Sequence, residues 1–155
     1  MIAALAWLES TGMARTISGS LPLTASLSAA HLLGFTLVLG GAFVMHLRLI
    51  GAMLPRTALL DVARPAGRLI ALGLIVSVIT GALLFAGRAS SIAANGIFQT
   101  KMSLLLLAVA WQLVVQHRLA RTTAQSPRAT RTAGVAGLAL WLGLAVTACA
   151  FILLE

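Results

Sequence analysis

The sequence has few charged residues and very few acidic ones. Only 9% of its 155 residues are charged, whereas about a quarter are charged in a typical soluble domain. The three carboxylate side chains are those of Glu9, Asp61 and Glu155, and none falls inside a long apolar segment. Catalysis by paired carboxylates and proton-coupled transport through a buried carboxylate are therefore not expected. A non-catalytic role in electron transfer or as an accessory subunit is favoured over an enzyme.

Cysteine is scarcer still than the acidic residues. The single one, Cys149, lies in an apolar segment and can form no internal disulfide, so it is interpreted as a small hydrophobic residue. The sequence contains no phosphate-binding loop, no CxxC pair and no CxxCH motif for haem attachment. Any haem would therefore be bound non-covalently.

Hydrophobic residues make up 60% of the chain and gather in four long segments. Each segment meets the length of about 20 residues that a helix needs to cross a bilayer. In lipid the backbone must satisfy its own hydrogen bonds, which favours helices. We predict an all-α integral membrane four-helix bundle in a single domain over 1–155. The predicted spans are 24–47, 66–87, 97–118 and 132–153.

A shorter apolar stretch, "MIAALAWLESTGMAR", precedes the first span. Ile2, Leu5 and Leu8 can share one face of a helix, with Glu9 and Arg15 elsewhere. The stretch is too short and too polar to cross a bilayer. We predict a short interfacial helix at the N-terminus.

The net charge of +8 is explained by topology rather than by nucleic-acid binding. The predicted loops 48–68 and 118–131 hold four arginines each, whereas the opposite side holds only Arg15, Arg88 and Lys101. The positive-inside rule then predicts both termini outside and the two arginine-rich loops in the cytoplasm. In this arrangement the first and third spans run parallel.

The three histidines all fall in or at the ends of the first and third spans. Ionisable groups inside a membrane are costly and point to function. His31 and His46 are 15 residues apart, which places them about 22 Å apart along a helix and about 60° apart around it. Met102 and His117 have the same spacing. We therefore expect His31 to face Met102 at an outer level and His46 to face His117 at an inner level.

This arrangement suits haem, whose iron accepts His and Met ligands. Cofactor sites in helical bundles are commonly built from facing side chains in the core. The inner site would be bis-histidine. The outer site would be His31 with Met102, or His31 with a sixth position that is open or filled by Lys101. Two such sites would form an electron path through the bilayer.

Basic residues lie near both levels, where they could meet haem propionates. Arg48, Arg68 and Arg118 lie at the inner end, and Arg88 and Lys101 at the outer end. Topology alone also explains the loop arginines, and Lys101 could reach the membrane surface with its long side chain.

A simpler alternative is that the histidines only form hydrogen bonds between helices in a cofactor-free accessory subunit. Gln112 and Gln116 lie near His117. They could orient a histidine ligand or hold helices together.

Four motifs carry a resemblance that covers about residues 7–118. "HLLGFTLVLGG", "HLRLIG", "TGALLF" and "NGIFQTKM" resemble a family of small bacterial four-helix membrane proteins. That family is similar to the membrane domain of copper-resistance protein D, and it also looks like b-type membrane cytochromes. The resemblance implies a multi-pass protein of the bacterial inner membrane, associated with a partner oxidoreductase or quinone, in a homo- or hetero-oligomer.

The resemblance leaves two cofactor hypotheses. The first is haem b in a membrane subunit that carries electrons. The second is copper binding or transport, because imidazole and thioether groups suit copper. In the copper hypothesis the residues along the route would be His31, Met45, His46, Met102 and His117.

Overall fold

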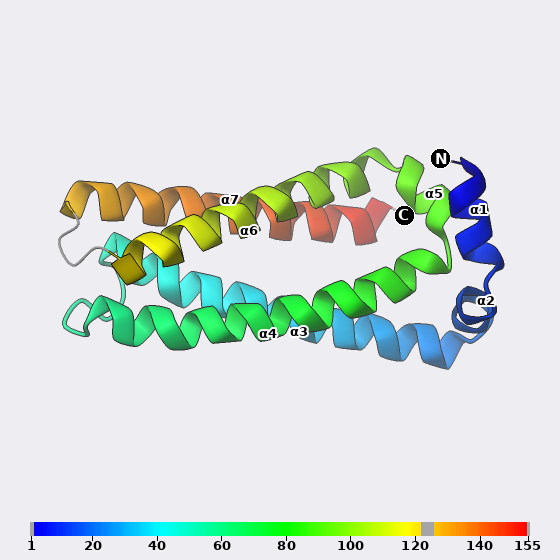
Figure 1. Cartoon of the computed structure of the whole chain (residues 1–155), viewed down its shortest axis with the longest axis horizontal. Helices are drawn as coiled ribbons and strands as arrows, with labels where there is room; N and C mark the ends of the chain where they lie inside the picture. Colours follow the sequence, from blue (N-terminus) through cyan, green and yellow to red (C-terminus); the bar gives the residue numbers. More distant parts are fainter. Residues whose placement is uncertain (1, 122–125, 155) are drawn as a thin grey trace.

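The computed structural model describes residues 2–121 and 126–154, and these residues form seven helices and no strand. The predicted single domain reaches Met1 and Glu155, which lie outside the described residues, as does the middle of the 118–131 loop. Four long helices run along the molecule (Figure 1). They are α3 (Leu21–Ile50), α4 (Leu59–Ala86), α6 (Gly96–Arg121) and α7 (Pro127–Leu154).

Each predicted span lies almost entirely within one of these helices, and all four are long and apolar enough to cross a membrane. The predicted all-α, membrane-spanning fold is confirmed. The helices extend beyond the predicted spans, most clearly at the start of α4, which begins at Leu59 rather than 66. Helix α3 has Pro22 in its first turn and ends at Ile50, just before Gly51, whose φ of 87° is left-handed. Both features are common at helix boundaries.

Three short helices lie across one end of the bundle (Figure 1). They are α1 (Ile2–Ser10), α2 (Gly12–Ser18) and α5 (Ala89–Ala94). The predicted N-terminal helix is therefore present, but it is divided in two at Thr11. The Thr11 hydroxyl accepts a hydrogen bond from the Ala14 amide at 3.3 Å and so begins α2.

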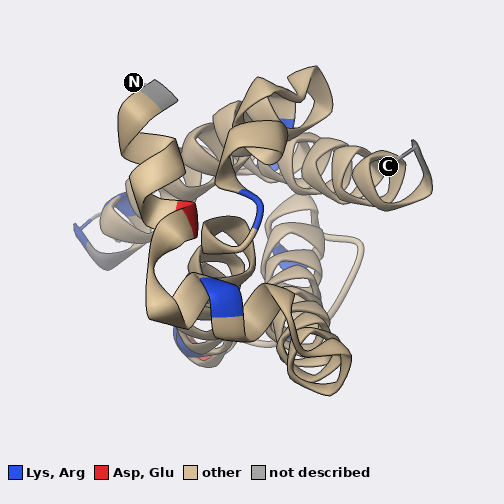
Figure 2. Cartoon of the chain, turned by 90° about the vertical axis from the view of Figure 1, so that its right-hand side faces the viewer, with Lys and Arg blue, Asp and Glu red and all other residues tan. Residues whose placement is uncertain are grey.

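A side-chain hydrogen bond ties these short helices together. The Glu9 carboxylate accepts from the Ser90 amide at 2.7 Å, joining α1 to the first turn of α5. Figure 2 looks onto this end of the bundle. We call the end that carries α1, α2 and α5 the short-helix end. The opposite end, which holds the loop 51–58 and the start of α7, is called the arginine-rich end.

The long helices pack as two pairs, α3 with α4 and α6 with α7, and α3 also packs against α7. Helices α4 and α6 touch much less. Helices α3 and α6 therefore lie diagonally across the bundle. Among the long helices, α3 contacts mainly α4 and α7. The central core consists of residues from all four helices: Val38, Ala42, Ile70, Ala108, Trp141 and Leu144.

Glycines allow α3 and α4 to approach closely. A Cβ on Gly73 would lie 2.5 Å from the Gly34 carbonyl oxygen and 2.8 Å from the Val38 side chain. A Cβ on Gly34 would lie 2.7 Å from Ser77 Oγ. Small residues at such positions let transmembrane helices pack through their backbones. Gly40, also on α3, has nothing within 4 Å of its Cβ position.

We expect Gly73→Ala to destabilise the protein by about 1–3 kcal/mol, because the added methyl group forces α3 and α4 apart. Gly40→Ala is the matched control and should be neutral or slightly stabilising, since alanine favours helix without a clash. Unfolding in mixed detergent micelles, followed by circular dichroism, measures both. Equal stability of the two variants would contradict the close packing.

Candidate functional site

His46 lies on α3 inside the bundle and is completely buried. Its Nε2 lies 3.1 Å from Oε1 of Gln112 on α6, and Gln112 Nε2 donates to Met45 Sδ at 2.9 Å. Because an amide oxygen only accepts, Nε2 of the neutral ring carries the proton. Nδ1 is then an acceptor, and among the described residues no donor reaches it.

The His46 ring is packed against helix α7. A Cβ on Gly137 would overlap three atoms of the imidazole, and a Cβ on Gly134 would lie 3.0 Å from the His46 carbonyl oxygen. Both glycines are buried. Three helices therefore enclose the ring, and α7 has glycine where any side chain would displace it.

His117, the predicted partner of His46, is exposed on α6. It follows Gln112 by five residues, which turns it about 140° away around the helix. The structure therefore does not bring His46 and His117 together, and Gln112 occupies the facing position instead. The ligand role of the two histidines stays a prediction. The sequence indicated neither that Gln112 is buried nor that Gly137 makes room for the His46 ring. The one feature that pointed to this contact was the presence of Gln112 near His117.

His31 lies on α3 toward the short-helix end, and it contacts α4. Its Nδ1 is 2.9 Å from the Ser77 carbonyl oxygen and 3.3 Å from Thr80 Oγ1. A carbonyl oxygen only accepts, so Nδ1 carries the proton and Nε2 keeps its lone pair. Among the described residues, Nε2 takes part in no hydrogen bond and is not one of the buried, unpartnered atoms.

The surroundings of His31 fix its ring further. Ser77 Oγ donates to the His31 carbonyl oxygen at 3.3 Å, so each residue bonds to the backbone of the other. A Cβ on Gly81 would lie 3.0 Å from Cε1 of the ring. Contacts with α4 thus hold one side of the His31 ring. The orientation of the ring is set by α3 and α4 together.

Across the bundle, Lys101 and Met102 occupy consecutive positions on α6. Met102 is 37% exposed, whereas Lys101 is partly buried, and its Nζ lies 5.6 Å from the centre of the Phe151 ring. Consecutive helical residues point about 100° apart, so the structure turns Lys101 rather than Met102 toward the interior.

Three aromatic rings lie beside Lys101 at the short-helix end. The Phe85 and Phe98 rings stack with centres 5.5 Å apart, and Phe98 and Phe151 are 6.0 Å apart. They come from α4, α6 and α7 respectively and are all partly exposed. These rings form an apolar, aromatic cluster at the short-helix end, with Lys101 against its Phe151 member.

The arginines predicted at the inner level have surroundings different from those of Lys101. Arg48 donates from Nε and Nη2 to the Thr57 carbonyl oxygen at 3.0 and 2.6 Å, which fastens the loop 51–58 to α3. Arg118 is exposed on α6. The described residues contain no cluster of three or more His, Cys, Asp or Glu side chains arranged to hold a metal ion.

These features define the class of protein: an all-helical, multi-pass membrane protein with one histidine enclosed in its core and a second held between α3 and α4. The chain belongs to a family of unknown function, DUF6644, whose model matches residues 6–153. No curated protein and no solved structure matches the chain.

We expect Gln112→Leu to destabilise the protein by about 1–3 kcal/mol, because it leaves both nitrogens of a buried imidazole unpaired. Adding His46→Leu to that variant should recover part of the loss, since replacing both partners with apolar groups is far less costly. Unfolding free energies of the single and double variants form a thermodynamic cycle. His117→Leu is the control for an exposed histidine and should change little. Strictly additive effects would show that His46 and Gln112 do not interact.

Proposed function

We propose that this chain is a haem b-binding membrane subunit that carries electrons, with His31 as the residue that would hold the haem near the short-helix end. The observation that carries the proposal is the hydrogen bond from His31 Nδ1 to the Ser77 carbonyl. Histidines that bind metals almost always donate their other ring N–H in this way, which fixes the tautomer and leaves Nε2 as the ligand atom.

The residues around His31 fit a haem group. The rings of Phe85, Phe98 and Phe151 offer apolar contact for a porphyrin. Lys101 brings a positive charge that could pair with a propionate or act as a second ligand. When bound, the haem iron would supply one-electron redox chemistry. Ser77 and Thr80 would hold the imidazole in place.

The surroundings of His46 do not fit a second haem. Its Nε2 is hydrogen-bonded to Gln112, its ring fills the space beside Gly137, and His117 faces away. We therefore propose one haem site per chain rather than two. His46 then has a structural role, as in the alternative in which histidines join helices.

The remaining sequence-based expectations complete the proposal. A relationship to the membrane domain of copper-resistance protein D and to b-type cytochromes is supported by the four quoted motifs. The excess of arginine at one end supports both termini outside the bacterial inner membrane and that end in the cytoplasm. A quinone or a partner redox protein would exchange electrons with the haem at the short-helix end. A partner is expected because the chain has little mass outside its long helices.

The test is the absorption spectrum of the purified protein, expressed with ample haem, before and after reduction with dithionite. We expect a Soret band and sharpened α and β bands on reduction. His31→Ala should abolish them, because the other unpaired imidazole nitrogen, Nδ1 of His46, is enclosed in the core against Gly137. His46→Leu and His117→Ala should keep the full haem content per chain.

Further measurements separate loss of the ligand from loss of the fold. Added imidazole should restore a Soret band to folded His31→Ala protein, because it can occupy the space of the missing ring. A wild-type spectrum with no haem bands, together with stoichiometric copper lost in His31→Ala, would replace haem by copper. The absence of both would support a cofactor-free subunit. Loss of haem in His46→Leu or His117→Ala, with His31→Ala unaffected, would contradict the assigned ligand.

A further inference from the structure

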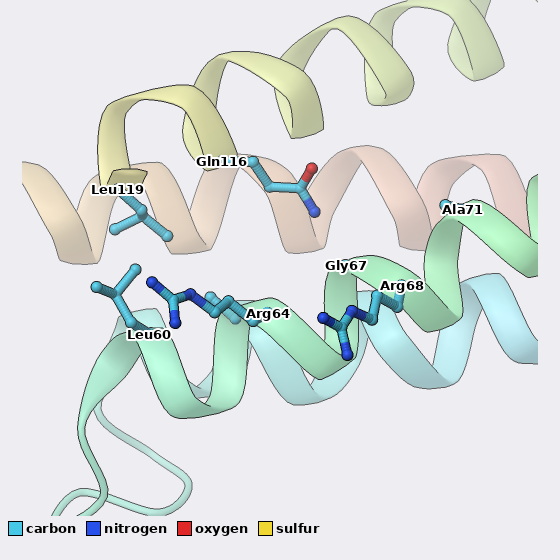
Figure 3. Close-up of a pocket in the computed structure, with 8 residues that line it drawn as sticks. Leu60, Arg64, Gly67, Arg68, Ala71, Gln116 and Leu119 are labelled. Atoms are coloured by element: carbon cyan, nitrogen blue, oxygen red, sulfur yellow. The ribbon is translucent and has the colours of Figure 1, made fainter. Parts of the chain in front are cut away.

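A groove of about 380 Å³ lies between α4 and α6 at the arginine-rich end (Figure 3). These are the two neighbouring helices that pack least against each other. The groove is far from the proposed haem site and does not depend on it. Its lining residues are Leu60, Ala63, Arg64, Gly67, Arg68, Ala71, Gln116 and Leu119.

Two guanidinium groups give the groove its charge. Arg64 and Arg68 are four residues apart and therefore share one face of α4. Among the described residues neither forms a hydrogen bond or an ion pair, and no carboxylate lines the groove. Gln116 reaches from α6 onto α4, where a Cβ on Gly67 would overlap its amide nitrogen (Figure 3). Donors from both helices thus line a groove that has no carboxylate.

The depth of the groove matches the boundary between lipid tails and headgroups. The nineteen residues 69–87 after Arg68 carry no charge. As a helix they span about 28 Å, close to the hydrocarbon thickness of about 30 Å. Arg68 therefore lies at the edge of the hydrocarbon layer and Arg64 one turn further into the headgroup region. The apolar lining of Ala63, Ala71 and Leu119 is suited to an acyl chain.

We propose that this groove binds an anionic phospholipid, with the phosphate on Arg64 and Arg68 and an acyl chain between α4 and α6. Guanidinium groups bind phosphate oxygens through paired, charge-assisted hydrogen bonds. Basic pockets between transmembrane helices are suited to anionic headgroups. The lipid would fill the space between α4 and α6, the two neighbouring helices that pack least against each other.

The test uses native mass spectrometry of the full chain in neutral detergent, with dioleoylphosphatidylglycerol or dioleoylphosphatidylcholine added in equal amounts. In a detergent micelle the retained lipid reports direct binding rather than attraction to a charged bilayer. We expect the wild-type protein to retain phosphatidylglycerol preferentially. Arg64→Gln with Arg68→Gln should weaken its binding roughly 30-fold, because each basic residue beside an anionic lipid contributes roughly fivefold.

The matched control is Arg56→Gln with Arg121→Gln, which removes the same charge from exposed positions that do not line the groove. It should bind phosphatidylglycerol almost as the wild type does. Equal loss in the two double variants would overturn the proposal. So would equal retention of the two lipids by the wild type, a result that needs no variant to fold. Displacement of phosphatidylglycerol by millimolar inorganic phosphate would show a free-anion site instead of a lipid site.

Discussion

The structure depends on one constraint, which is that polar groups among apolar helices must find partners within the protein. In lipid no water compensates an unpaired donor or acceptor. His46 pairs with Gln112 on the diagonal helix, and His31 pairs with the Ser77 carbonyl on the adjacent one. Each bond joins two helices, so the histidines contribute to the arrangement of the bundle whether or not either one binds a cofactor.

The glycines follow from the same constraint. A buried imidazole needs both a partner and space, and the space is provided where a neighbouring helix has no side chain. Gly137 lies against the His46 ring and Gly81 against the His31 ring. Gly34 and Gly73 bring the backbones of α3 and α4 close enough for the reciprocal bonds between His31 and Ser77. The polar contacts and the close helix packing therefore support each other.

The sequence predicted the four spans because an uninterrupted apolar run of about 20 residues is typical of a membrane-spanning helix. It did not predict the start of α4, because Asp61 and Arg64 interrupt the apolar pattern while their backbone remains helical. The sequence also did not predict which side chains pair across helices. Helical spacing gives the depth of a residue and its angle on its own helix, but not the lateral order of the helices. Gln112 and His117 lie about 140° apart around α6, and it is Gln112 that faces His46.

Lys101 and Met102 are oriented in the opposite way to an adjacent charged and apolar pair in a soluble protein. In water the apolar residue of an adjacent pair turns inward and the charged one outward. Here Met102 is the more exposed residue and Lys101 the more enclosed. Against lipid the thioether is well accommodated at the surface, whereas the ammonium group is stabilised by the Phe151 ring inside the bundle. In a membrane protein, the side chains that face the interior are thus selected by their need for partners. The interior of this bundle accordingly holds its polar side chains in bonded groups, with His46 paired to Gln112 and His31 to Ser77 and Thr80.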